Sequence, residues 1–138
     1  MKKFLALVLA MLMVFSLCAC GDGGDSSGEK VVKIGVFEPI TGQNGAGGKQ
    51  EVLGMQYANA QNPTVEIGGE TYKVELVIAD NESTTDKAAS AASQLVAQGV
   101  SIVLGTYGSN VAIAGSNTFK EAGIPALGVT CTNPQVTE

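Results

Sequence analysis

The sequence contains no histidine and no tryptophan, and it has only three cysteines. Histidine is the commonest protein ligand for transition metals and the usual side chain for moving protons near neutral pH. Its absence excludes histidine-ligated metal sites and histidine-based acid–base catalysis from these residues. We therefore expect neither a histidine-ligated metal nor a histidine-based enzymatic activity.

The N-terminal residues have the order of charge and polarity found in an export signal. A basic start, Met1-Lys2-Lys3, is followed by an apolar run from Phe4 to Leu17 and then by small residues before Cys20. A helix that spans a membrane needs about 20 apolar residues, so this run is too short for a permanent span. We expect residues 1–19 to be a signal peptide that is removed.

The four residues Leu17-Cys18-Ala19-Cys20 resemble the lipobox of bacterial lipoproteins. In a lipobox, a small residue precedes the cysteine that receives diacylglycerol and becomes the new N-terminus. The resemblance implies that Cys20 is lipidated and anchors the protein to the cell membrane, outside the cytoplasm. The alternative is an ordinary secretory signal whose cysteines have no role.

Residues 20–30 follow as a polar stretch rich in glycine and serine, which predicts a flexible tether. Removal of the signal peptide takes Lys2 and Lys3 from the 8 basic residues, which leaves 6 against 13 acidic residues and a net charge of −7. Such an acidic surface is a poor partner for nucleic acid. Because Cys18 would be removed and Cys20 lipidated, Cys131 would have no partner for an intramolecular disulfide.

From residue 31 onward, short β-branched runs alternate with longer alanine-rich or amphipathic segments. This alternation is typical of βαβ units and predicts an α/β fold with a Rossmann-like parallel sheet. The expected strands are 31–37, 72–79, 100–104 and 124–129. The expected helices are 49–60, about 83 to 98, and 109–122, and a Gly-Gly hairpin is expected over 65–72.

Each expected helix has an apolar stripe that should face the core. The stripes comprise Val52, Met55 and Tyr57 in the first helix, Ala88, Ala91, Ala92, Leu95 and Val96 in the second, and Ala112, Gly115, Ser116 and Phe119 in the third. Residues 133–138 form a polar loop where a doubly wound domain would continue. We therefore expect residues 31–138 to be an incomplete lobe.

Ligands of open parallel sheets bind beyond the carboxyl ends of the strands, so the loops there are candidate sites. The glycine-rich loop 38–48 could bind an anion through its backbone amides, or it is only a flexible connection. It has neither the G-x-G-x-x-G spacing nor the Gly-Lys-Ser/Thr of nucleotide sites, so no cofactor is expected. The acidic residues Asp80 and Glu82 are explained by capping of the next helix, without catalysis.

Two further loops at the same edge carry hydroxyl groups. Ser109 begins the third expected helix, where free N–H groups and the helix dipole favour a carboxylate; the alternative is that Ser109 is only the N-cap. Thr130 and Thr132 follow the last strand and could receive an ammonium group and the second carboxylate oxygen. Cys131, between them, has no base nearby, so we expect a small buried thiol.

Five short motifs occur in order along residues 31–138. They are KIGV with PITG at 33–42, ADNES at 79–83, VLG at 103–105 with Ser109, GIP at 123–125 and TNP at 132–134. Their order and spacing resemble the start of leucine/isoleucine/valine-type solute-binding proteins, the type I periplasmic-binding-fold receptors of ABC importers. The resemblance implies a two-lobed receptor of which this chain holds part of the first lobe.

The resemblance also assigns the candidate ligand-binding residues. It implies that Ser109, the backbone of Thr130, and Thr132 hold the carboxylate and amino groups of the ligand. Family members often have an aromatic residue in the first loop, where this sequence has Gly45-Ala46-Gly47-Gly48 instead.

The implied function is that of a lipid-anchored, monomeric substrate-binding component of an ABC importer. It would capture branched-chain or similar small amino acids, with a membrane permease as its partner and without a cofactor. The alternative is an extracellular ligand-sensing module of a signalling receptor with the same fold. An exported flavodoxin-like enzyme is disfavoured because histidine and phosphate-binding motifs are missing.

Overall fold

The structure is a computed structural model that describes residues 28–138. The expected signal peptide, the lipidated Cys20 and most of the expected tether lie outside the described residues. The expected lobe, residues 31–138, lies entirely within them.

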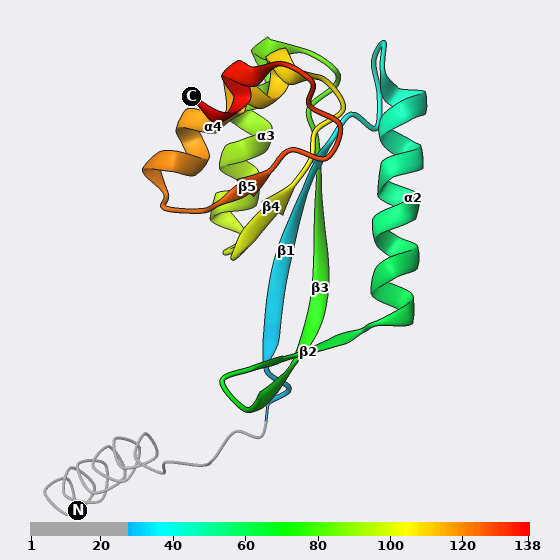
Figure 1. Cartoon of the computed structure of the whole chain (residues 1–138), viewed down its shortest axis with the longest axis vertical. Helices are drawn as coiled ribbons and strands as arrows, with labels where there is room; N and C mark the ends of the chain where they lie inside the picture. Colours follow the sequence, from blue (N-terminus) through cyan, green and yellow to red (C-terminus); the bar gives the residue numbers. More distant parts are fainter. Residues whose placement is uncertain (1–27) are drawn as a thin grey trace, which may run out of the picture.

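A five-stranded sheet forms the centre of the fold, with β1 in the middle and β2 at one edge (Figure 1). The strands are β1 (Val31–Glu38), β2 (Thr64–Ile67), β3 (Glu70–Asp80), β4 (Ile102–Leu104) and β5 (Ala126–Leu127). Their spatial order is β2-β3-β1-β4-β5, and every pairing is parallel except that of β2 with β3. This arrangement confirms the expected α/β class.

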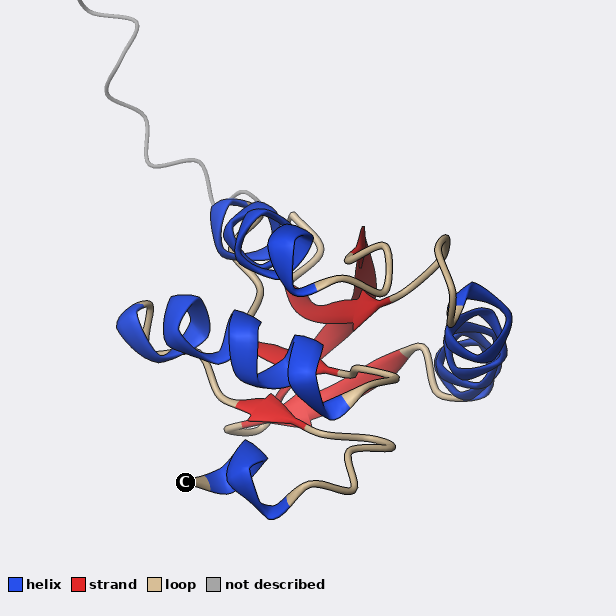
Figure 2. Cartoon of the chain, turned by 90° about the horizontal axis from the view of Figure 1, so that it is seen from above, coloured by secondary structure: helices blue, strands red, loops and turns tan. Residues whose placement is uncertain are grey.

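Three α-helices cover the two faces of the sheet. They are α2 (Gly45–Gln61), α3 (Thr85–Ala97) and α4 (Ser109–Glu121), and a short 3-10 helix, η1 (Pro134–Thr137), follows β5. Helices α3 and α4 lie together on one side of the sheet, and α2 lies alone on the other (Figure 2). The loops that join the carboxyl ends of the strands to the helices all gather at the top of Figure 1.

The core lies between the sheet and the pair α3/α4. Phe37, Ala79 and Val103 point into it from three neighbouring strands, because alternate residues of a strand face opposite sides. The ring of Phe119 from α4 meets the ring of Phe37 edge to face, with centroids 5.5 Å apart and planes at 83°. Such a pair adds about 0.5–1.5 kcal/mol beyond the burial of its apolar area.

The expected stripe of α3 is confirmed, since Ala88, Ala91, Ala92 and Leu95 are buried there. On α4, Gly115 and Phe119 are buried as expected, but the third buried residue is Val111 and Ser116 is exposed. On α2 the assignment of Tyr57 to the inner face was wrong, because this residue is 70% exposed. Helix α2 contacts the rest of the molecule through smaller residues instead.

Helix α2 begins at Gly45, four residues before the expected start at Lys49. Glycine is a weak helix former, which is why the sequence suggests a loop over 45–48. Tertiary packing overrides this preference: a Cβ on Gly48 would lie 2.1 Å from the carbonyl oxygen of Pro39. Only glycine at position 48 allows the helix to approach the first loop so closely.

The hairpin before β3 is part of the main sheet. Gly68 and Gly69 both have positive φ, 62° and 83°, as a two-residue turn of this kind requires, and β2 pairs antiparallel with β3 as an edge strand. The last two parallel strands, β4 and β5, are shorter than expected. The expected polar loop at 133–138 contains the helix η1, whose first turn is capped by the Asn133 side chain accepting the N–H of Gln135 at 3.0 Å.

Candidate functional site

A hollow of about 270 Å³ opens at the edge of the sheet where the strands end. It lies between the N-terminal ends of α2 and α4, whose N-cap residues are Asn44 and Gly108. The residues that line it are Asn44, Ser83, Gly108, Ser109, Asn110, Val111 and Asn133. The hollow therefore combines residues from four loops that are far apart in the sequence.

The chemistry of this hollow favours an anion. None of the lining residues is charged, although the whole chain carries 13 acidic residues and a net charge of −5. Neither α2 nor α4 is capped by a side chain. The first turn of α4 and the N-cap residue of α2 line the hollow, so the positive ends of both helix dipoles lie at it without a protein carboxylate. A carboxylate ligand would supply the acceptor that these helix ends lack.

Ser109 is the first residue of α4, and its side chain is held by the loop after β5. Its Oγ accepts the N–H of Thr132 at 3.1 Å and the N–H of Asn133 at 3.2 Å. The hypothesis that Ser109 is merely the N-cap is wrong, since Gly108 occupies that position. A hydroxyl has two acceptor lone pairs and one hydrogen to donate, so with two N–H groups bound Ser109 is left to act as a donor.

The other two predicted ligand residues lie on the loop after β5. The backbone N–H of Thr132 donates to the Ser109 hydroxyl. The side chains of Thr130 and Thr132 are exposed, and neither residue lines the hollow. The Cys131 thiol is half-buried and lies 3.5 Å from the carbonyl oxygen of Thr106. The structure thus places the loop beside Ser109, and a ligand role for either threonine stays a prediction.

Asp80 fixes the first loop beside the hollow. Its Oδ1 accepts the N–H of Ile40 at 2.8 Å and of Glu82 at 2.8 Å, and its Oδ2 accepts the hydroxyl of Thr41 at 2.7 Å. Burial alone would raise the pKa of Asp80, but these hydrogen bonds outweigh it and lower the pKa below the usual 3.8. Asp80 therefore joins two loops instead of capping α3, whose N-cap is Thr84.

Ser83 and Asn81 extend the same network. The Ser83 hydroxyl accepts the N–H of Asn44 at 2.9 Å and donates to the carbonyl of Thr41 at 3.0 Å, so it ties the start of α2 to the loop after β3. Asn81 is fully buried and bonds to Thr106 in the loop after β4. Together these contacts hold three loops around the hollow in one arrangement.

Glu38, at the end of β1, is a buried acid beneath this network. Its side chain has no exposed surface, and its Oε2 accepts the N–H of Tyr107 at 2.8 Å. Burial raises the pKa of Glu38 to about 8, and the nearby Glu51 carboxyl of α2 acts in the same direction. Neither acid was singled out from the sequence, because Glu38 was assigned to the glycine-rich loop 38–48, whose backbone amides were the candidate binding groups, and Glu51 to an amphipathic helix.

Four lining residues were also missed by sequence reasoning as ligand candidates: Asn44, Ser83, Asn110 and Asn133. Asn44 stands directly before Gly45 and Asn133 directly before Pro134, which are common signs of a helix start and of a turn. Those signs indicate local structure, but only the folded chain shows that the two asparagines share a hollow with Ser109.

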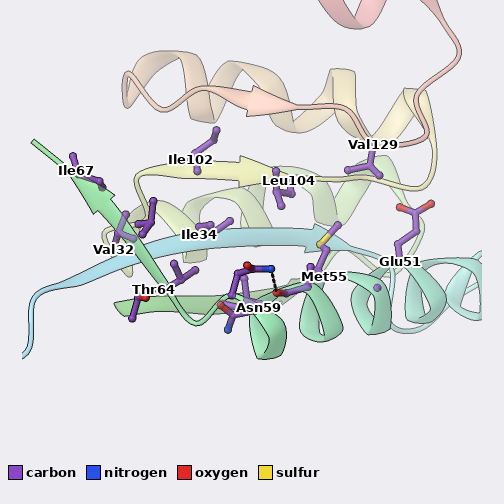
Figure 3. Close-up of a pocket in the computed structure, with 16 residues that line it drawn as sticks. Val32, Ile34, Glu51, Met55, Asn59, Thr64, Ile67, Ile102, Leu104 and Val129 are labelled. Carbon is purple, nitrogen blue, oxygen red and sulfur yellow. Dashed lines mark hydrogen bonds between the residues drawn. The ribbon is translucent and has the colours of Figure 1, made fainter. Parts of the chain in front are cut away.

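A second, larger hollow runs along the face of the sheet between β1, β3, β4 and α2 (Figure 3). Its volume is about 760 Å³, and most of the residues that line it are apolar, including Val32, Ile34, Met55, Leu76 and Leu104. Glu51 and Asn59 are among its few polar residues. Because this groove offers few partners for charged groups, it suits apolar side chains better than a zwitterionic ligand.

Two classes of feature are missing from residues 28–138. No helix there has both the length and the hydrophobicity needed to cross a bilayer. Within the same residues, no cluster of three or more histidine, cysteine, aspartate or glutamate side chains is arranged to bind a metal ion.

Comparison with known proteins agrees with this architecture. A model of the family described as periplasmic binding protein matches residues 31–138. The Leu/Ile/Val-binding protein homolog 1 of Brucella abortus (strain 2308) is 35% identical over 117 residues, which is 84% of this chain and 30% of that protein. An amino acid binding protein of Pseudomonas aeruginosa is 38% identical over 139 residues, or 99% of this chain and 34% of that protein.

A solved structure extends the likeness to three dimensions. The branched-chain amino acid transporter substrate-binding protein LivJ of Streptococcus pneumoniae, in complex with isoleucine, superposes with a TM-score of 0.68 at 31% identity, over 78% of this chain and 31% of that one. The chain thus spans about a third of the length of the relatives that it matches. A family model that matches residues 31–138, together with these relatives, shows that the chain belongs to the periplasmic binding protein family.

Proposed function

We propose that this chain is part of the extracytoplasmic substrate-binding component of an ABC importer, which captures branched-chain or similar small amino acids without catalysis. The observation that carries the proposal is the uncharged hollow between two uncapped helix N-termini, with the Ser109 hydroxyl left as a donor. An amino acid supplies the carboxylate that fits these donors.

Within this proposal, the Ser109 hydroxyl and the first N–H groups of α4 bind one carboxylate oxygen. The Thr132 hydroxyl binds the second oxygen, and the backbone carbonyl of Thr130 accepts from the ammonium group. Thr130 and Thr132 lie on the loop that Ser109 already holds by two hydrogen bonds.

Residues 31–138 span about a third of the matching relatives. We therefore propose that they form part of the first lobe of a two-lobed, monomeric receptor that closes over its ligand. Closure excludes water and adds contacts from the second lobe, which accounts for tight binding. The expected partner is an ABC permease, to which the closed receptor delivers its ligand.

We also propose that Cys20 carries a lipid anchor and that residues 20–30 act as a tether. An anchor would keep the receptor near its permease and so raise its effective concentration there. Incorporation of a radiolabelled fatty acid into the protein, lost in Cys20→Ser but retained in Cys18→Ser, tests the anchor independently of ligand binding.

Isothermal titration of the full-length protein tests the central proposal. Leucine, isoleucine and valine are compared with two control ligands. The first is the amine that corresponds to leucine without its carboxylate group, and the second is benzoate, which has a carboxylate but no ammonium group. We expect binding of one or more of the amino acids and none of the amine. Failure of every amino acid to bind would refute the proposal, and binding of benzoate alone would show a carboxylate receptor of another class.

The second candidate function is ligand sensing by a signalling receptor with the same fold. It uses the same hollow and differs in the partner of the closed state. Uptake of labelled amino acid by cells that carry the protein, lost on its deletion and restored by its return, would favour import over sensing.

A further inference from the structure

Two acidic side chains, Glu38 of β1 and Glu51 of α2, lie within hydrogen-bonding reach of each other beneath the candidate site. Glu38 is fully buried, and while its Oε2 accepts from Tyr107, its Oε1 has no hydrogen-bond partner. Glu51 comes from α2 on the groove side of the sheet, and its Oε2 is likewise buried without a partner. In Figure 3 the Glu51 side chain points away from the axis of α2, at the end of the groove near Val129.

Two ionised carboxylates in this position would be unfavourable for two reasons. Like charges repel strongly in a buried environment, and each group would keep a buried oxygen without a donor. One proton held between the two groups removes both problems, because the protonated carboxyl donates to the ionised one. Such a pair titrates as a unit, as pairs of close carboxyl groups do elsewhere.

We propose that Glu38 and Glu51 share a single proton, and that this carboxyl pair positions the loop carrying Tyr107 and Ser109, so that ligand affinity depends on pH. The effect on ligand affinity rests on the proposed function, whereas the sharing of a proton does not.

The contacts of Glu38 explain how the pair reaches the site. Its Oε2 holds the N–H of Tyr107, which is two residues before Ser109. A Cβ on Gly105 would lie 2.8 Å from its Oε1 and 2.3 Å from the carbonyl oxygen of Phe37, so the loop after β4 lies directly against the carboxyl group. A movement of Glu38 would therefore be transmitted to the loop that carries Ser109.

Other titratable groups around the pair do not replace the shared proton. Asp80 lies beside Glu38 in the register of β1 and β3, but its carboxylate is bound to the first loop. The loop after β4 contributes the backbone N–H of Tyr107 and the hydroxyl of Thr106; both favour the ionised form of Glu38, but burial and Glu51 outweigh them and raise its pKa. No salt bridge among residues 28–138 involves Glu38 or Glu51, so no lysine there neutralises the second charge.

Loss of the proton leaves two charges facing each other between β1 and α2. Glu51 can relieve the repulsion by turning into the groove that it lines, whereas Glu38 is enclosed on all sides. The repulsion then displaces Glu38, and because the ionised carboxylate holds the N–H of Tyr107 more strongly, the loop after β4 is displaced with it. We expect the Ser109 hydroxyl to lose its alignment with the ligand at the same pH.

Thermal unfolding of the full-length protein without ligand tests the shared proton. The pKa of Glu38 is about 8 in the folded state against 4.5 for an ordinary glutamate, so the folded state binds the extra proton between these values. Stability from this group is complete below pH 4.5, falls as pH rises, and is lost above pH 8. The unfolding midpoint should fall across this window.

Three variants separate the pair from other groups. Glu38→Gln imitates the protonated acid, so the fall of the midpoint between pH 4.5 and 8 should disappear. Glu51→Gln donates to Glu38 without a charge of its own, so the fall should end at a lower pH. Glu121→Gln, at the exposed end of α4, should leave the wild-type profile unchanged.

Amino-acid titration across the same pH range tests the effect on the site. Affinity of the wild type should fall about fivefold or more from neutral pH to above pH 8, the lower end of usual coupling between sites, and the fall should be absent in Glu38→Gln. An equal fall in both proteins would overturn the positioning role. If no amino acid binds at any pH, both the proposed function and the positioning role are refuted. The pH dependence of the unfolding midpoint still tests whether the two carboxyl groups share a proton.

Carboxyl-carbon NMR of the wild type needs no variant and covers the case that Glu38→Gln does not fold. One glutamate carboxyl should titrate near pH 8. Titration of all glutamates near 4.5 would overturn the proposal, as would a profile that calcium or sodium ions remove, because the pair would then bind a cation.

Discussion

Asn81 and Thr106 form a hydrogen bond of 2.7 Å between two loops, and neither residue has any exposed surface. Asn81 Nδ2 also lies 3.4 Å from the carbonyl oxygen of Phe37, and its Oδ1 accepts the N–H of Ser83 at 3.1 Å. One buried amide thus connects the ends of β1, β3 and β4. It fixes the relative positions of the loops that surround the hollow.

Replacing Asn81 with alanine should destabilise the protein by about 1–3 kcal/mol, because it leaves buried partners without a hydrogen bond. The free energy of unfolding in urea measures the change. Asn117→Ala, at an exposed position of α4, is the matched control and should have little effect. If Asn81→Ala and Thr106→Val are additive in the double variant, the two side chains are not coupled and this interpretation fails.

Ser109→Ala should weaken amino-acid binding by about 1–3 kcal/mol, the cost of leaving polar partners unsatisfied. The variant removes the donor for the ligand and the acceptor for the N–H groups of Thr132 and Asn133. Ser90→Ala is the control, because the Ser90 hydroxyl bonds only within α3, to the carbonyl of Lys87. Isothermal titration measures the change in affinity. An unchanged affinity would mean that Ser109 only holds the loop after β5 and does not bind the ligand.

Asp80→Asn should destabilise the protein near neutral pH by about 1 kcal/mol, because the amide cannot accept all the hydrogen bonds that the partly exposed carboxylate accepts. The lowered pKa of Asp80 means that its contribution is present above pH 3.8 and is lost as pH falls through the still lower native value. The difference from the wild type should therefore shrink below pH 3.8. Glu75→Gln, at an exposed position of the same strand, should show no such pH-dependent difference.

Two glycines of α2 should respond to alanine in opposite ways. A Cβ on Gly48 would lie 2.1 Å from the carbonyl oxygen of Pro39, so Gly48→Ala should destabilise by about 1–3 kcal/mol. Gly54 has open space around its Cα, so Gly54→Ala should stabilise by about 0.5–1 kcal/mol, the usual gain in a helix interior. Thermal unfolding of the two variants measures both, and the same sign for both would contradict the close approach of α2 to the first loop.

The main elements of the fold could be predicted because their patterns are strong. The β-branched run at 31–38 and the alanine stripe of α3 fix a strand and a helix by period alone. The start of α2 could not be predicted, because Gly45 and Gly48 favour a loop locally and become helical only by packing against Pro39 and Ile40. Tyr57 was wrongly assigned to the inner face of α2, because the helix packs against its neighbours through small residues and not through its aromatic side chain.

The site could be predicted only in part. The rule that ligands bind where parallel strands end indicated the edge at which the hollow lies, and the structure places Ser109 in contact with the loop of Thr132. The asparagines of the hollow and the carboxyl pair came only with the structure. Their meaning depends on contacts between separate elements, such as Asn81 with Thr106, 25 positions apart, and Glu38 with Tyr107, 69 positions apart, and no local pattern encodes such contacts.

The glycine-rich first turn of α2 also limits how this sequence can change over time. Gly48 is closed to any side chain, whereas Leu53 and Tyr57 on the outer face are 56% and 70% exposed and meet no such restriction. Mutation can thus alter the outer surface of the helix freely, while its inner surface stays fixed by the backbone of the first loop. This chain can therefore acquire new outer surfaces without disturbing the edge where we propose that the ligand binds.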